Sequence, residues 1–230
     1  MKTVICNTIL AASLNTIILI LFMILAISFI TCKIYIWDDL ALLFKPKENK
    51  DDKLFDTLAN KLRSASKISI NLLYEKSYED IQQTLHMRDA ENKNIFSYTI
   101  ILTALFSALY IFSKILFNPF YKDLFFSLFS CLVASAFCLI ISTMAYLKAL
   151  SMQYELPRDV ASIIGCNSKM IKINTIAVNA AGASKNQDAN RKKIAFCKIA
   201  KKYIKACLLF YLVFSATIFL YRTFSFILTF

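Results

Sequence analysis

Glycine and proline are scarce in this chain: two of its 230 residues are glycine and three are proline. A soluble β protein of this size would need many more of them for its turns, so the composition favours helices joined by few tight turns. Hydrophobic residues make up 58% of the chain, above the roughly 45–50% that is usual in soluble domains. We therefore expect an all-α integral membrane protein.

Residues that bind metals or carry catalysis are also few. The chain has one histidine, and its seven cysteines form no C-x-x-C pair, which argues against a zinc site of the usual spacing. Cys131, Cys138 and Cys207 lie inside apolar runs, where a thiol acts as a small hydrophobic group. No Ser/His/Asp, Cys/His, paired-carboxylate or H-E-x-x-H arrangement is present. We predict a protein that is not an enzyme and has no cofactor.

Four apolar runs are long enough to cross a bilayer. They cover residues 8–31, 95–113, 124–147 and 206–221, and contain no charged side chain. A bilayer core of about 30 Å needs about 20 apolar residues in a helix, so we predict four transmembrane helices with two helical cytoplasmic segments. Arg222 follows the fourth run: it either snorkels to the outer headgroups or, if that helix begins deeper, is buried and functional.

Basic residues are unevenly distributed between these runs. Residues 33–94 hold 11 of them and residues 148–205 hold 12, whereas four lie elsewhere. Basic residues are retained on the cytoplasmic side, so we expect both segments in the cytoplasm of a bacterium, with both termini and a short turn on the periplasmic side of the inner membrane. The predicted organisation is 1–36, periplasmic N-terminus and first span; 37–94, first cytoplasmic segment; 95–147, second and third spans; 148–205, basic cytoplasmic segment; 206–230, fourth span and C-terminus.

The two cytoplasmic segments differ in charge. The first has 11 acidic residues and a net charge of zero, and apolar residues at helical spacing, such as Leu54 and Leu58, predict a helical hairpin in it. The second has three acidic residues and a net charge of +9. Residues 180–190 are small and polar, which indicates a flexible linker. An apolar patch either packs on the first segment or docks another protein; it comprises Met170, Ile171, Ile173, Ile176 and Val178.

A basic helix precedes the fourth span. Such juxtamembrane clusters bind anionic lipids and fix topology, or they dock an acidic partner. No motif supports a nucleic-acid or nucleotide module, although basic charge permits such binding. The basic residues are Arg191, Lys192, Lys193, Lys198, Lys201, Lys202 and Lys205.

Small and hydroxyl residues recur at steps of three or four in two of the spans, so each set shares one helix face. In lipid such faces allow close helix approach. They pack the chain on itself, join subunits, or line a pore that an oligomer would build. The second span carries Thr99, Thr103 and Ser107, and the third carries Ser127, Cys131, Ser135 and Ser142.

In size, span number and basic cytoplasmic face, the chain resembles the small multi-span membrane proteins of bacterial anti-phage defence, such as the four-span membrane subunit of Kiwa. The resemblance implies a membrane-anchored homo-oligomer that recruits a soluble cytoplasmic protein during infection. We therefore predict a subunit that anchors or senses at the membrane and docks such a partner. The alternative is an oligomeric effector that forms pores or disrupts the membrane.

Overall fold

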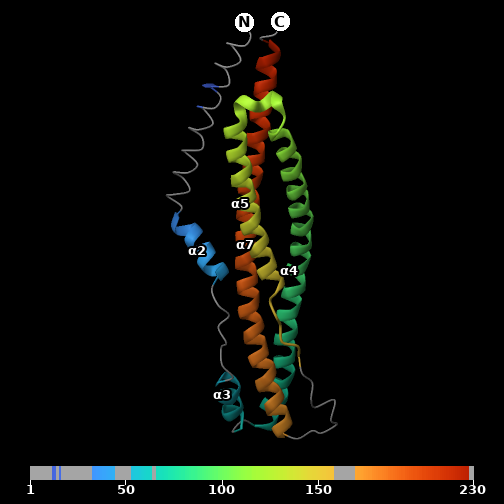
Figure 1. Cartoon of the computed structure of the whole chain (residues 1–230). Helices are drawn as coiled ribbons and strands as arrows, with labels where there is room; N and C mark the ends of the chain where they lie inside the picture. Colours follow the sequence, from blue (N-terminus) through green and yellow to red (C-terminus); the bar gives the residue numbers. More distant parts are fainter. Residues whose placement is uncertain are drawn as a thin grey trace. The chain divides into compact units, whose positions relative to one another are not determined.

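The computed structural model describes residues 12–13, 16, 33–44, 53–63, 66–157 and 169–227, and within these ranges every regular element is a helix. Two of the helices are far longer than a single membrane crossing requires. The elements are α2 (Lys33–Phe44), α3 (Lys53–Leu62), α4 (Lys67–Leu116), the 3₁₀ helix η1 (Pro119–Leu124), α5 (Phe125–Leu150) and α7 (Lys169–Ile227) (Figure 1).

Three helical stretches are long and apolar enough to cross a membrane: Ser69–Leu116, Pro119–Leu150 and Lys169–Phe226. They contain the second, third and fourth predicted spans. The all-helical class predicted from composition is thereby confirmed for the described residues, which include three candidate membrane-spanning helices. The first predicted span, residues 8–31, lies outside the described residues apart from positions 12–13 and 16.

The chain divides into two compact units. Unit 1 comprises Met1–Lys45, Tyr98–Tyr146 and Lys198–Phe230, and unit 2 comprises Pro46–Ser97 and Leu147–Cys197. Helices α4 and α7 each contribute residues to both units. Unit 1 thus holds the apolar parts of α4, α5 and α7, whereas unit 2 holds most of the two segments that the sequence marks as polar.

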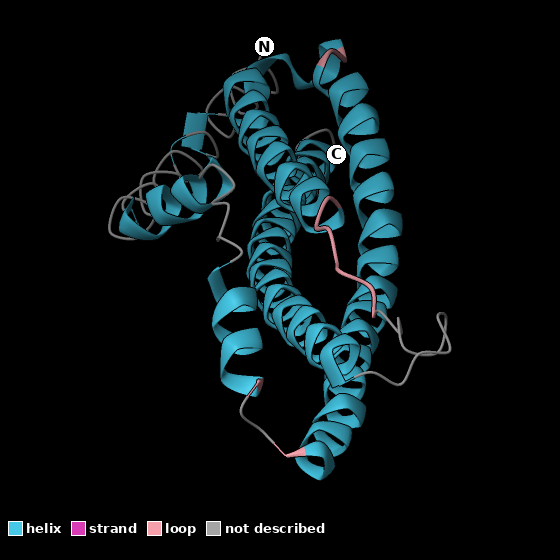
Figure 2. Ribbon diagram, turned by 90° about the horizontal axis from the view of Figure 1, so that it is seen from below, coloured by secondary structure: helices cyan, strands magenta, loops and turns pink. Residues whose placement is uncertain are grey.

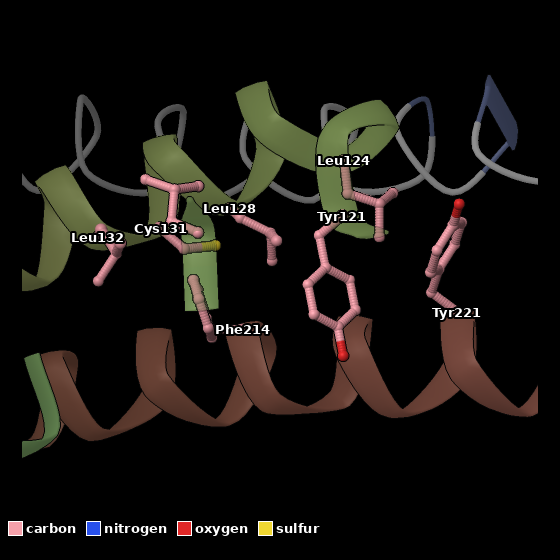
Figure 3. Close-up of a cluster of buried hydrophobic side chains, with 8 residues drawn as sticks. Tyr121, Leu124, Leu128, Cys131, Leu132, Phe214 and Tyr221 are labelled. Carbon is pink, nitrogen blue, oxygen red and sulfur yellow. The ribbon is translucent and has the colours of Figure 1, made fainter. Parts of the chain in front are cut away.

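The core of unit 1 is built by α4, η1, α5 and α7. Phe214 of α7 is fully buried and stacks on Phe112 of α4, with ring centroids 4.6 Å apart. Tyr211 of α7 donates a buried hydrogen bond of 2.8 Å to the carbonyl oxygen of Leu105 in α4. Figure 3 shows this core, whose buried members are Leu116, Tyr121, Leu124, Leu128, Cys131, Leu132, Phe214 and Tyr221.

The turn between α4 and α5 forms where the sequence predicts one. Asn118 caps η1, because its side-chain oxygen accepts a hydrogen bond of 3.0 Å from the backbone N–H of Phe120, and Pro119 suits the first position of a helix. Tyr121 is buried in the turn, and the exposed Arg222 lies over its ring at 5.9 Å from the centroid. Arg222 is therefore not buried within this unit.

Unit 2 has a separate apolar core. Ile173 and Ile176 of α7 are buried with Ala59 of α3 and Ile70 of α4. These two isoleucines of the predicted apolar patch thus pack on helices of the first polar segment. This is one of the two alternatives that the sequence left open. Met170, at the start of α7, is instead half exposed.

The predicted linker over residues 180–190 is wrong, because this stretch is helical and continuous with the rest of α7. Alanine has the highest helix propensity, and four alanines in this stretch, Ala180, Ala181, Ala183 and Ala189, favour the helix locally. Two asparagines in the same stretch, Asn186 and Asn190, are buried and hydrogen-bonded to other elements. Polar residues that suggested a linker are therefore interior contacts of a helix.

Candidate functional site

Four lysines of α7 form an exposed face in unit 1, which we call the lysine face: Lys198, Lys201, Lys202 and Lys205. At about 100° per residue they fall within an arc of about 100°. Ile199, Tyr203 and Ile204 alternate with them and are buried. This part of α7 is therefore amphipathic: its apolar side belongs to the core and its charged side faces outward.

One lysine of this face is neutralised within the unit. The Nζ atom of Lys202 lies 2.7 Å from Oδ2 of Asp39 in α2, and the lysine side chain is about half exposed. Such a solvent-accessible ion pair contributes at most about 1 kcal/mol. Lys198, Lys201 and Lys205 have no acidic partner among the residues that the structure describes. Within the part of the chain that the structure describes, the lysine face thus has three positive charges without an acidic partner.

Helix α2 brings aromatic side chains to the same unit. Trp37 and Phe44 are more than half exposed, while Leu43 of the same helix is completely buried. Exposed aromatic residues close to basic ones are typical of the membrane–water interface. The ion pair between Lys202 and Asp39 ties α2 to α7 at this position.

The other predicted basic residues lie in unit 2. Arg191 and Lys192 are exposed, but Lys193 is only 2% exposed. Its Nζ atom donates a hydrogen bond to Oδ1 of Asn92 in α4. Lys193 is therefore not available on an exposed basic surface, although the sequence groups it with one.

Lys193 belongs to a buried polar cluster that sequence reasoning missed. The cluster joins α4, α7 and the irregular segment of residues 151–157 that follows α5, which we call the strap; Figure 2 draws the strap as a pink loop. In α7, Asn186 and Asn190 are at most 4% exposed. Buried amides cost free energy unless they are hydrogen-bonded, and both have partners here.

The hydrogen bonds of the cluster link all three elements. Asn186 donates to Oγ1 of Thr84 at 3.1 Å and to the carbonyl oxygen of Glu155 at 2.9 Å, and its own oxygen accepts from the N–H of Glu155 at 2.8 Å. Asn190 donates to the carbonyl oxygen of Thr84 at 3.0 Å and accepts from the hydroxyl of Tyr154 at 2.8 Å. The strap is thus held through both main-chain and side-chain atoms.

Two cations lie over the ring of Tyr154. The guanidinium carbon of Arg88 is 5.6 Å from the ring centroid and the Nζ atom of Lys193 is 5.5 Å from it. Each such contact contributes about 0.5–2 kcal/mol, more when water is excluded. Burial raises the pKa of the Tyr154 phenol above its usual value, so the hydroxyl remains a hydrogen-bond donor at neutral pH.

A signal for this cluster was present in the sequence. Asn179, Asn186, Asn190 and Lys193 recur at steps of seven, four and three, which places them within about 60° of one face of a helix. A polar stripe of this kind is typical of a helix with a polar contact surface. The stripe was missed because the small and polar composition of residues 180–190 predicted a linker.

The two rows of small and hydroxyl residues have different surroundings. Those of α5 are buried, and Ser142 donates a hydrogen bond of 3.1 Å to the carbonyl oxygen of Ala200 in α7. Those of α4 are exposed. The buried row is Ser127, Cys131, Ser135 and Ser142, and the exposed row is Thr99, Thr103 and Ser107.

Within the described ranges, no group of three or more His, Cys, Asp or Glu side chains could hold a metal ion. The chemistry that these residues offer is the binding of anionic surfaces by lysines and the hydrogen bonding of peptide groups by amides. Comparisons with protein-family models, with curated proteins and with solved structures found no match to this chain.

Proposed function

We propose that this chain is a non-enzymatic, four-span subunit of a bacterial inner membrane that self-associates and docks a soluble, acidic cytoplasmic protein, as in anti-phage defence. In this proposal residues 8–31 form the first span, both termini are periplasmic, and the lysine face lies on the cytoplasmic side of the fourth span. The 23 to 4 partition of basic residues supports this orientation.

The observation that carries the proposal is the lysine face. Three lysines without an acidic partner among the described residues project from one side of α7, immediately before the apolar run that begins at Ala206. Clustered charge of one sign attracts an oppositely charged protein over long range and orients it. Anionic lipid headgroups are attracted to the same lysines, by roughly 1 kcal/mol per basic residue near the surface.

Changing Lys198, Lys201 and Lys205 to glutamine tests the docking role. If each exposed charge contributes about 0.5 kcal/mol, partner affinity should fall about tenfold, and the binding that remains should depend less on salt. The measurement is co-purification of soluble proteins from lysate. Repeating it with the protein reconstituted in vesicles of neutral lipid separates protein docking from lipid binding.

A matched control removes the same number of exposed charges elsewhere, at Lys76, Lys93 and Lys169. This control should retain the partner. Equal losses in the two variants would show that overall charge, and not the lysine face, governs association. A partner retained fully by the first variant would contradict the proposal.

One observation favours the second candidate, a pore or membrane-disrupting oligomer. Thr103 and Ser107 are exposed on α4, and their hydroxyls donate to the carbonyl oxygens four residues earlier at 2.9 and 3.0 Å. With its hydrogen satisfied in this way, each hydroxyl oxygen still has a lone pair directed outward. A ring of such helices from several subunits would present a weakly polar lining.

A further inference from the structure

Part of the strap is held through its backbone. The N–H and C=O groups of Glu155 both pair with the side-chain amide of Asn186, at 2.8 and 2.9 Å. A residue in an antiparallel strand pair exchanges the same two hydrogen bonds with its neighbour, and a side-chain amide presents the same donor and acceptor as a peptide unit. Asn186 therefore recognises a main chain, whatever side chain that residue carries.

The residues that hold the strap are positioned by α4 and α7 alone. We call them the seat: Thr84, Arg88, Asn186, Asn190 and Lys193. Thr84 accepts hydrogen bonds from both asparagines, which fixes the direction of their amides. The strap adds the backbone of Glu155 and the hydroxyl of Tyr154, which complete the hydrogen bonds of those amides. It also adds the Tyr154 ring beside the two cations. The seat is thus preorganised for a segment of this chemistry.

Gly182 permits the close approach of the strap to α7. A β-carbon at this position would lie 2.9 Å from Cδ1 of Ile81 and 3.3 Å from Cβ of Glu155. One of the two glycines of the chain is therefore located where α4 and the strap both pass against α7. The strap is only partly covered: Ser151, Gln153, Glu155 and Leu156 are exposed. The Glu155 side chain is half exposed, and its carboxylate lies 3.9 Å from Nζ of Lys185.

We propose that the seat is a recognition site for a peptide segment of the partner in which an aromatic residue precedes an acidic one, and that the chain's own Tyr154 and Glu155 occupy it in cis. This inference rests on the proposed function, in which an acidic soluble protein docks. Arg88 and Lys193 of the seat lie over the aromatic ring, and the neighbouring Lys185 is complementary to the acidic residue of such a segment. Arg88 is itself paired with Asp89 at 2.8 Å.

Exchange of one segment for another is easier than simple opening of the strap. An empty seat would leave the amides of Asn186 and Asn190 without part of their hydrogen bonds, which is costly for groups shielded from water. A segment with the same backbone and aromatic groups restores those bonds. Because the strap is irregular in structure, its release breaks no helix.

Fluorescence anisotropy with a labelled peptide tests this proposal on the full-length protein. The peptide carries the sequence of residues 151–157, and the protein is purified in neutral detergent. The Tyr154→Ala variant, whose own strap has lost its ring and hydroxyl, should bind the peptide at least about tenfold more tightly than wild type. The reason is that the apparent affinity for the peptide is proportional to the fraction of seats that the chain's own strap leaves free.

Modified peptides provide controls that leave the folding of the protein unchanged. N-methylation at the glutamate removes the N–H that donates a hydrogen bond to Oδ1 of Asn186, and should abolish binding. A scrambled peptide should not bind. Absence of binding to the Tyr154→Ala variant, or equal binding of the scrambled peptide, would overturn the proposal. Dissociation of a wild-type oligomer on adding the peptide would assign the seat to the strap of a second copy, which also overturns it.

These outcomes are independent of the lysine face, because no partner protein is present in the measurement. A peptide that does not bind leaves the co-purification result for Lys198, Lys201 and Lys205 unaffected. Conversely, a peptide that binds while the lysine variant retains its partner would contradict the proposed function of the lysine face and not the seat.

Discussion

Helices α4 and α5 carry hydroxyl and other small residues at the same spacing, yet one row is exposed and the other is buried. In α4, Thr99, Thr103 and Ser107 recur every four residues on the outward side. In α5, Ser135 and Ser142 are completely buried. Spacing therefore indicates which residues share a face, but it does not indicate whether another helix covers that face.

The difference between the two rows follows from their hydrogen bonds and neighbours. Ser142 reaches across to the backbone of α7 at Ala200, a contact that needs a small side chain at the helix crossing. Among the described residues, Thr103 and Ser107 bond to their own helix, while the hydroxyls of Thr99 and Tyr146 hydrogen-bond each other. The α5 row thus fixes a helix contact inside the chain, and the α4 row leaves its outer side available to lipid or to a second subunit.

The largest expected effect comes from enlarging the buried row. Ser135→Leu and Ser142→Leu each insert a side chain into a packed crossing, which costs about 1–3 kcal/mol, and Ser142 also loses its hydrogen bond to α7. The melting temperature in mild detergent should drop strongly.

The matched control is Ser107→Leu on the exposed row, which should change the melting temperature little. Similar losses from both rows would show that α4 is covered as fully as α5 in the folded protein. A Ser142→Leu variant that melts like wild type would contradict the close contact between α5 and α7.

A smaller effect is expected on the inner side of α4. Tyr211→Phe keeps the ring in the core but removes the hydroxyl that donates to Leu105. The carbonyl oxygen of Leu105 still accepts a hydrogen bond within the helix, so the free energy of unfolding should fall by about 0.5–1.5 kcal/mol. Thermal unfolding followed by circular dichroism measures this loss, and Tyr110→Phe on the exposed side of α4 is the control. Equal stabilities of the two variants would remove the distinction between the inner and outer sides of α4.

The smallest effect is expected from the exposed row itself. The double variant Thr103→Val and Ser107→Ala should stay within about 0.5 kcal/mol of wild type, as exposed substitutions usually do. Docking requires no pore, so ion leakage from liposomes should be absent from wild type and variant alike. Leakage in wild type that falls in the variant would favour the pore-forming candidate and assign the α4 row to its lining.

Much of the fold follows from the sequence, because long uncharged runs have few structural alternatives. The runs at 95–113, 124–147 and 206–221 lie in α4, α5 and α7, and the turn at Asn118 and Pro119 is located as predicted. Two of the four boundaries between the units, after Ser97 and after Tyr146, fall within three residues of the predicted ends of the apolar runs. Solvent preference determines the runs, and local capping determines the turn.

The sites were only partly predictable. The sequence grouped seven basic residues, but Lys193 is buried against Asn92, and Lys202 is paired with Asp39, which is distant in sequence. Neither contact is visible in local composition. The strap and its seat were missed because the small and polar composition of residues 180–190 predicted a linker, although the asparagines recur at helical spacing. Their partners Thr84 and Tyr154 are distant in sequence.

The sequence by itself determined an all-helical class with runs apolar enough to cross a membrane, the positions of those runs and the excess of positive charge before the last of them. Hydrophobicity and charge act residue by residue, so these properties can be read without knowing any contact. The tertiary structure decided which small-residue row is covered, which lysines remain exposed and what the buried asparagines bind. Those outcomes depend on pairs of residues far apart in the chain, such as Ser142 with Ala200 and Asn190 with Thr84, which meet only when the helices pack.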